Sequence, residues 1–206
     1  WNFVQEEALK VGLRLNVSKC EVWGWGGEEA EWMGRLPSEI KRVLQDGFEL
    51  LGAPIGSKKF SEEYAEKRLK NIEETLAELK NVDDAQVELA LLRSCLGFPR
   101  FGFTVRSAPP HLIETAAIKF DSLMEKVASE RFQMRMDDDM KLQWTLPIRF
   151  GGIGVPAASD VSAPAYLGNA LLALPYVQEL FEDDEEELKL SDMEGVEEAW
   201  EKMVGI

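Results

Sequence analysis

The chain has 206 residues, 45% of them hydrophobic, which is enough material for one large domain or two small ones. Its 38 acidic and 23 basic residues give a net charge of −15, the wrong sign for a protein that attracts nucleic acid through its overall charge. No apolar run reaches the roughly 18–20 residues that span a bilayer, and no signal-peptide pattern opens the chain. We therefore expect an intracellular protein without a membrane partner. The start at Trp1, with no methionine, indicates a piece of a longer reading frame.

Much of the negative charge lies near the C-terminus. Residues 182–202 hold 11 acids and 2 bases, a net charge of −9 that leaves −6 for the rest of the chain. We predict that this region is a solvated acidic tail. The remaining body is still mildly acidic, which argues against strong binding of a duplex.

Residue types used in nucleophilic and metal-dependent catalysis are sparse. His111 is the only histidine and no serine or cysteine motif accompanies it, so hydrolase chemistry is disfavoured. Cys20 and Cys95 lie far apart without metal-ligand spacing, which predicts two reduced packing thiols. Asp137–Asp139 is predicted to be a solvated loop, because three adjacent acids on a loop point in different directions and do not converge on a metal. No metal site is predicted in this chain.

The first part of the chain mixes helix and strand signals. Gly12 suits the end of a helix, Asn16–Ser18 suits a turn between two short strands, and Ser38 suits the cap of a helix that stops at Gly47. A strand bent at glycine and proline follows. These elements are expected at residues 1–12, 13–15, 21–23, 38–47 and 48–55.

The second part is predicted to be helical, because apolar residues recur there at spacings of three and four. Ser61 is predicted to cap the first helix, and Asp83 with Gln86 the second. Pro99 is predicted to enforce the break after the second helix. The helices are expected at residues 61–79, 85–96, 109–127 and 166–180.

Two segments of the first part carry a family resemblance. Gly12–Glu21 reads GLRLNVSKCE and Phe48–Gly56 reads FELLGAPIG. Together they resemble the end of the palm of a reverse transcriptase of the kind carried by non-LTR retroelements. In that family the first segment directly follows the strand with the catalytic aspartate pair, and the second resembles the primer-grip hairpin.

The second part adds two further segments to this resemblance. Leu92–Arg100 resembles the end of a thumb-region helix, and Leu146–Val155 resembles the segment that follows the thumb in the same family. The four segments keep the family's order and spacing over residues 3 to about 170.

The resemblance implies an α+β, mostly helical fold, in which a small antiparallel β palm remnant precedes a helical thumb and connection bundle. The opening turn and strand should lie beside the later kinked ribbon, in a shared sheet that flanks a magnesium centre outside this chain. The implied regions are a palm remnant with a primer-grip-like hairpin, a helical thumb-like region, a connection segment with an apolar helix, and an acidic tail. Their bounds are residues 1–57, 58–143, 144–181 and 182–206.

The resemblance also implies roles for particular residues. Lys19 would be a catalytic residue that reaches the triphosphate once the missing front half is present, and its plain alternative is a surface lysine. Leu51, Gly52 and Pro54 would form the primer grip or, equally well, a strand bend. The remaining nucleic-acid-binding candidates are bases that could contact phosphates or simply form a charged helix face, namely Lys58, Lys59, Lys67, Arg68 and Lys70.

The parent enzyme is expected to use Mg²⁺ held by aspartates upstream of Trp1. The 206-residue chain is therefore expected to hold no cofactor and to transfer no nucleotide alone. Its implied partners are a primer–template nucleic acid and the missing N-terminal fingers and palm portion. The alternative function is an acidic helical protein-interaction module, or an inactive domesticated relic that does not bind nucleic acid.

Overall fold

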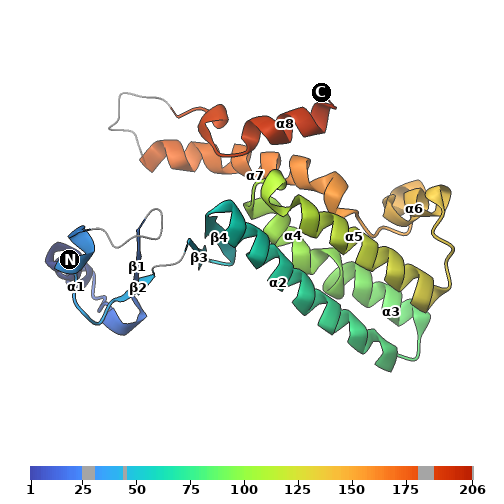
Figure 1. Ribbon diagram of the computed structural model, residues 1–206, viewed down its shortest axis with the longest axis horizontal. Helices are drawn as coiled ribbons and strands as arrows, with labels where there is room; N and C mark the ends of the chain where they lie inside the picture. The colour runs from blue at the N-terminus through green and yellow to red at the C-terminus, as the bar shows by residue number, and fades with distance from the viewer. Residues whose placement is uncertain (25–30, 44–45, 181–187, 206) are drawn as a thin grey trace.

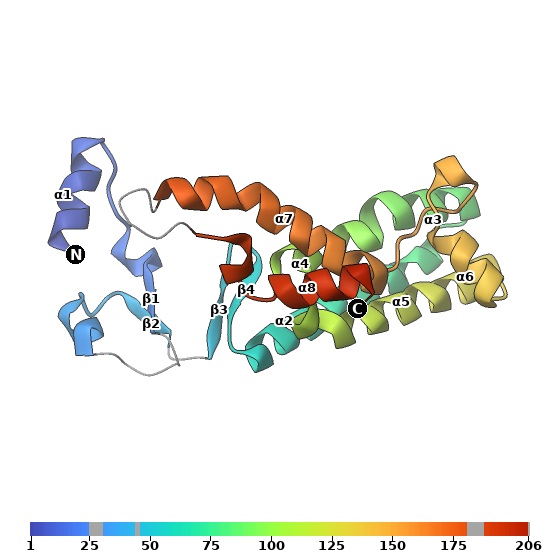
Figure 2. The same ribbon diagram turned by 90° about the horizontal axis from the view of Figure 1, so that it is seen from above.

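The computed structural model describes residues 1–24, 31–43, 46–180 and 188–205. In this part the chain is mostly helical with short strands, which confirms the predicted α+β class. The strands are β1 (Glu21–Trp23), β2 (Lys41–Val43), β3 (Gly47–Leu50) and β4 (Ala53–Gly56). The α-helices are α1 (Asn2–Lys10), α2 (Lys58–Ala77), α3 (Ala85–Leu91), α4 (Phe98–Ser107), α5 (Pro110–Phe132), α6 (Asp138–Thr145), α7 (Ala158–Leu180) and α8 (Val196–Val204). Figures 1 and 2 show α1, β1 and β2 at one end of an elongated molecule, with α3 and α6 at the other.

The N-terminal segment differs from its prediction after α1. The helix ends near Gly12, whose φ of 78° and N–H bond to the Leu9 carbonyl fit a helix end. Residues 13–15, however, are not a strand, and Val17–Lys19 forms a 3₁₀ turn. The predicted local hairpin is therefore wrong, because β1 finds its partner in β2, twenty residues along the chain.

The predicted helix at residues 38–47 is also wrong. The Ser38 hydroxyl bonds the neighbouring Glu39 carboxylate and caps no helix, and residues 41–43 form β2, parallel to β1. The Arg42 guanidinium fixes the preceding loop by donating to the carbonyls of Met33 and Ile40. Non-local pairing and this arginine override the local capping signal.

The two small sheets are separate. β1 and β2 form one pair, and β3 and β4 form an antiparallel hairpin. The expectation that the opening strand and the kinked ribbon share a sheet is therefore wrong. The pieces still meet through their aromatic side chains, since the ring centroids of Trp23 and Phe48 lie 5.1 Å apart.

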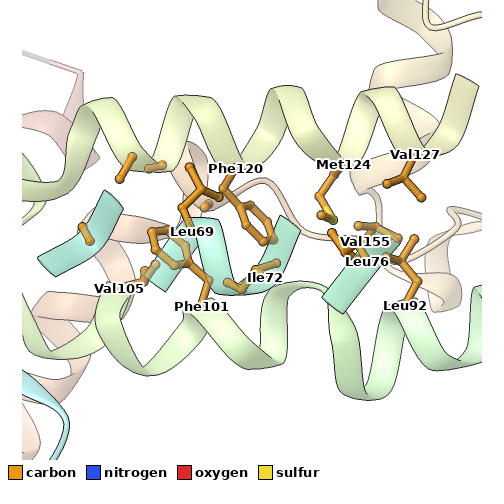
Figure 3. Close-up of a cluster of buried hydrophobic side chains, with 14 of the residues drawn as sticks. Leu69, Ile72, Leu76, Leu92, Phe101, Val105, Phe120, Met124, Val127 and Val155 are labelled. Atoms are coloured by element: carbon orange, nitrogen blue, oxygen red, sulfur yellow. The ribbon is translucent and has the colours of Figure 1, made fainter. Parts of the chain in front are cut away.

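The helices pack as a bundle around one main core. α2 packs against α5, and α7 packs across both α4 and α5. The predicted apolar stripe of α2 is confirmed, because all its members are buried: Ala65, Leu69, Ile72, Leu76 and Leu79. Figure 3 shows Phe101 and Val105 of α4 pointing toward Phe120 of α5. The helix begins earlier than predicted, since Ser57 caps it by accepting from the Phe60 N–H at 3.2 Å, while Ser61 is buried.

Helix α4 was not predicted. Pro99 was interpreted as a helix breaker, but it lies in the first turn of α4, where its missing N–H removes no helical hydrogen bond. α3 continues through a π-helical turn, Leu92–Leu96, and Gly97 separates it from α4. Phe101 of α4 stacks on Phe120 with centroids 5.2 Å apart, so α4 supplies part of the core.

The C-terminal part contains more helix than expected. Asp137 caps α6 by accepting from the Met140 N–H, so the run of aspartates opens a helix and is not a loop. α7 begins eight residues before the predicted Tyr166. α8 packs on α7 through the buried Val196 and Ala199, so part of the expected acidic tail is folded. The acidic run at residues 182–187 lies outside the described residues.

The start of α7 is fixed to α5 by Asp121. Its carboxylate accepts hydrogen bonds from the Ala158 N–H at 2.6 Å and from the Ser159 N–H at 3.0 Å. The Ser159 hydroxyl donates a third bond at 2.5 Å. Burial raises the pKa of Asp121 above its ordinary value, against the hydrogen bonds from Ser159 and Ala158, which lower it.

This raised pKa leads to an expected pH dependence. The folded state holds the Asp121 proton more tightly than the unfolded state, so the group's contribution to stability is greatest below the ordinary pKa of 3.8 and is lost as the pH rises through the folded pKa. The stability advantage of the wild type over Asp121→Asn should therefore fall as the pH rises from about 3 to about 7. Urea unfolding across this range measures it, with Asp139→Asn as the control for loss of an exposed carboxylate. A constant difference would contradict the expectation.

Candidate functional site

The turn of the β3–β4 hairpin is the most unusual backbone feature among the predicted site residues. The strands pair from Gly47 with Gly56 to Leu50 with Ala53, which leaves a two-residue loop. Leu51 has a φ of 51° and Gly52 a φ of 88°. Positive φ at both loop positions is the type I′ pattern that suits a hairpin, but it is unfavourable for a leucine. Leu51 is also 92% exposed, so a strained residue displays its side chain to solvent.

The turn is held against the first helix of the bundle by Tyr64. The hydroxyl of Tyr64 donates to the Gly52 carbonyl at 2.5 Å. Burial raises the pKa of Tyr64, against the nearby Arg68 charge, and Glu49 also raises it. The guanidinium of Arg68 lies 5.8 Å from the centre of the Tyr64 ring. The hairpin therefore has a fixed position relative to α2, and Arg68 lies close to that contact.

Lys58 and Lys59 begin α2 directly after the hairpin. Positive charge is unfavourable at a helix N-terminus, and each lysine lies near a glutamate one turn along. Lys58 is 3.9 Å from Glu62, and Lys59 is 4.0 Å from Glu63. All four side chains are largely exposed, so each lysine–glutamate ion pair is weak. Both lysines therefore remain available to a phosphate.

The other predicted bases lie on different sides of α2. Lys67 lines a cleft of about 440 Å³ next to the hairpin. Lys70 lines a second groove, between α2 and α5, together with Lys119 and Lys126. The five predicted phosphate-binding bases therefore form no single patch. Their distribution is that of an ordinary charged helix face.

The cleft beside the hairpin was not anticipated from the sequence. Its lining combines aromatic rings with balanced charges and includes Glu21, Lys41, Arg42, Val43, Phe48, Glu49, Phe60, Glu63, Tyr64 and Lys67. Equal numbers of acids and bases give it no net attraction for a polyanion. The aromatic residues on β3 and in the first turns of α2 were the signal available in the sequence. No pattern in the sequence indicated that these rings would line one cleft.

Lys19 stands apart from this cleft. It ends the 3₁₀ turn Val17–Lys19 and is exposed, and its ammonium group makes no hydrogen bond or ion pair with another described residue. Pro54 is buried in β4, opposite Glu49, so its ring supports the hairpin from inside. Cys95 is exposed, which corrects its interpretation as a packing thiol.

Neither a metal site nor a membrane span is found in the described part of the chain. Within it, no three histidine, cysteine, aspartate or glutamate side chains gather closely enough to hold a metal ion. The described helices include none that is both long and apolar enough to cross a bilayer. Comparison with protein-family models, with curated proteins and with solved structures found no match.

Proposed function

We propose that this chain is the palm end and thumb of a reverse transcriptase, in which the β3–β4 hairpin and the helical bundle hold a primer–template. The observation that carries the proposal is the strained turn at Leu51–Gly52, which exposes the Leu51 side chain and is fixed to α2 by the Tyr64 hydroxyl. Strain of this kind at a surface supports a binding role.

The order of the elements supports the same proposal. After α1 comes a small strand region, the hairpin follows, and α2 starts two residues after the hairpin with Lys58 and Lys59. These lysines lie next to the strand that would carry the primer-grip backbone, in a position to contact phosphates. We assign no catalytic step to this chain. Nucleotide transfer would need aspartates from another polypeptide segment.

Primer–template binding tests the proposal. A DNA primer annealed to an RNA template should bind the purified chain at low salt, and the affinity should fall steeply as salt is added. Fluorescence anisotropy of the labelled primer measures this. With Mg²⁺ and deoxynucleotides present, the chain alone is expected not to extend the primer.

A matched pair of lysine variants localises the contact. Lys59→Glu, beside the hairpin, should weaken binding and reduce the salt slope by about 1. Lys80→Glu makes the same charge change in an exposed position three residues beyond the far end of α2 and should have no such effect. Absence of any binding at low salt would overturn the proposal and favour an acidic interaction module. Equal effects of the two variants would remove the hairpin from the contact.

A further inference from the structure

The longest acid-free stretch of this acidic chain runs from residue 89 to residue 113. It contains Arg93, Arg100, Arg106 and the only histidine, in a protein with a net charge of −15. It also includes the whole of α4, the helix that the sequence pattern did not predict. The local charge of this segment is therefore opposite to that of the chain.

Helix α4 has a buried apolar face and an opposite, exposed face that carries its two arginines. Phe101 and Val105 are fully buried and point into the core, as Figure 3 shows. Arg100, Phe103 and Arg106 are exposed and follow one another at intervals of three, which places them one turn apart on the outer side of the helix. We call these three residues the α4 stripe. Phe103 is 47% exposed although it lies in a bundle helix.

The α4 stripe lies beside α2 and the hairpin turn. The Arg100 guanidinium donates to the Thr75 hydroxyl of α2 at 3.1 Å. A Cβ atom at Gly52 would lie 3.3 Å from the Phe103 ring, so the ring edge covers the backbone of the turn. The Arg106 guanidinium makes no hydrogen bond or ion pair with another described residue and is available to a ligand.

The side of α2 next to the α4 stripe carries Arg68, Asn71 and Thr75, which share one side of the helix because they are spaced by three and four. Glu66 is turned toward α5, where it bonds Lys119. Two acidic side chains border this surface: Glu49, which interacts with Tyr64 at the hairpin end, and Glu78, one turn beyond Thr75. An anion that approaches the α4 stripe therefore meets arginines at the centre of the surface and carboxylates at its two ends.

We propose that the α4 stripe binds a single nucleic-acid strand, with one unpaired base stacked on Phe103 and the flanking phosphates on Arg100 and Arg106. This inference rests on the proposed function and assigns its contact to residues outside the predicted set. An exposed ring offers a stacking surface to any base, and arginines one turn to each side match phosphates on both sides of that base. Arginine forks bind phosphate oxygens in pairs, which suits this contact better than isolated lysines.

Two oligonucleotides of 12 units test the assignment. One carries bases, and the other is an abasic strand with the same phosphates. Phe103→Ala should weaken binding of the base-bearing strand about 5- to 100-fold and leave the abasic strand unaffected. Phe103→Trp should restore the affinity, because it keeps an aromatic face. The salt slope should not change in either variant.

The arginine contact has its own signature. Arg106→Gln should weaken both oligonucleotides and reduce the salt slope by about 0.7, the value for one phosphate on a single strand. Arg135→Gln, at another exposed arginine outside the helices, serves as the matched control and should leave both affinities unchanged. Thermal unfolding midpoints equal to that of the wild type confirm that each variant is folded.

The outcomes separate the two proposals. One outcome is that the wild type binds the primer–template while Phe103→Ala and Arg106→Gln bind the single strands as tightly as the wild type does. In that case the α4 stripe is not the binding site, and the proposed function stands. Equal weakening of the base-bearing and abasic strands by Phe103→Ala would overturn the stacking contact. If the wild type binds neither the strands nor the primer–template, both proposals fall.

Discussion

Replacing Phe120 with alanine is expected to lower the free energy of unfolding by about 3–5 kcal/mol, the range for a large aromatic side chain removed from a core. Phe120 is fully buried between two helices. It stacks on Phe101 with an interplanar angle of 11° and meets the edge of Phe98 at 6.4 Å. The cavity left behind would be lined by rings that cannot collapse into it without moving α4.

Urea unfolding monitored by far-UV circular dichroism measures this change. Phe150→Ala is the matched control, because Phe150 is 65% exposed and its removal should change stability by no more than about 0.5 kcal/mol. Equal losses in the two variants would mean that the bundle core is not centred on Phe120.

Replacing Gly56 with alanine is expected to disrupt the β3–β4 hairpin and to cost about 3 kcal/mol or more, the upper part of the range for a strained backbone position. Gly56 has a φ of 144°, and a Cβ there would lie 2.3 Å from both the Asp46 carbonyl oxygen and the Gly47 Cα. These contacts are backbone atoms that cannot rotate away. Gly47 faces it across the strand pair and is equally confined, since its own Cβ would lie 2.5 Å from the Phe60 ring.

Hydrogen exchange of the β3 and β4 amides, together with urea unfolding, measures the effect. Gly168→Ala in α7 is the control, because nothing lies within 4 Å of a Cβ at that position. Alanine favours a helix interior by about 1 kcal/mol over glycine, so this variant should be neutral or more stable. Retained protection of the hairpin in Gly56→Ala would contradict the geometry of the strand pair.

The bundle was the part of the fold that local pattern could predict. The apolar residues of α2 and the turn after it recur at 4-3-4-3 spacing over five positions. This spacing predicts a helix with one buried side. The strand β2 follows from no local signal, since its residues gain their conformation by pairing with β1 across a long loop. Ser38, which precedes β2, is of a residue type that often caps helices, but no helix follows it.

Pro99 shows how one signal can have two meanings. A proline ends a helix when it comes late and begins one when it comes early. The deciding pattern lay beyond it, in Phe101 and Val105, which are four residues apart and both buried. The basic character of residues 89–113 could be read from the sequence, but its concentration on one exposed side of α4 depended on recognising that helix.

The conformation of Leu51 bears on how the hairpin tip can evolve. Glycine or asparagine would adopt its φ of 51° with less strain, and a leucine side chain that is 92% exposed gains almost no burial in return. Substitution by glycine should therefore make the isolated chain more stable. A leucine at this tip is therefore unfavourable for the stability of the fold itself, because burial of its side chain does not offset the backbone strain.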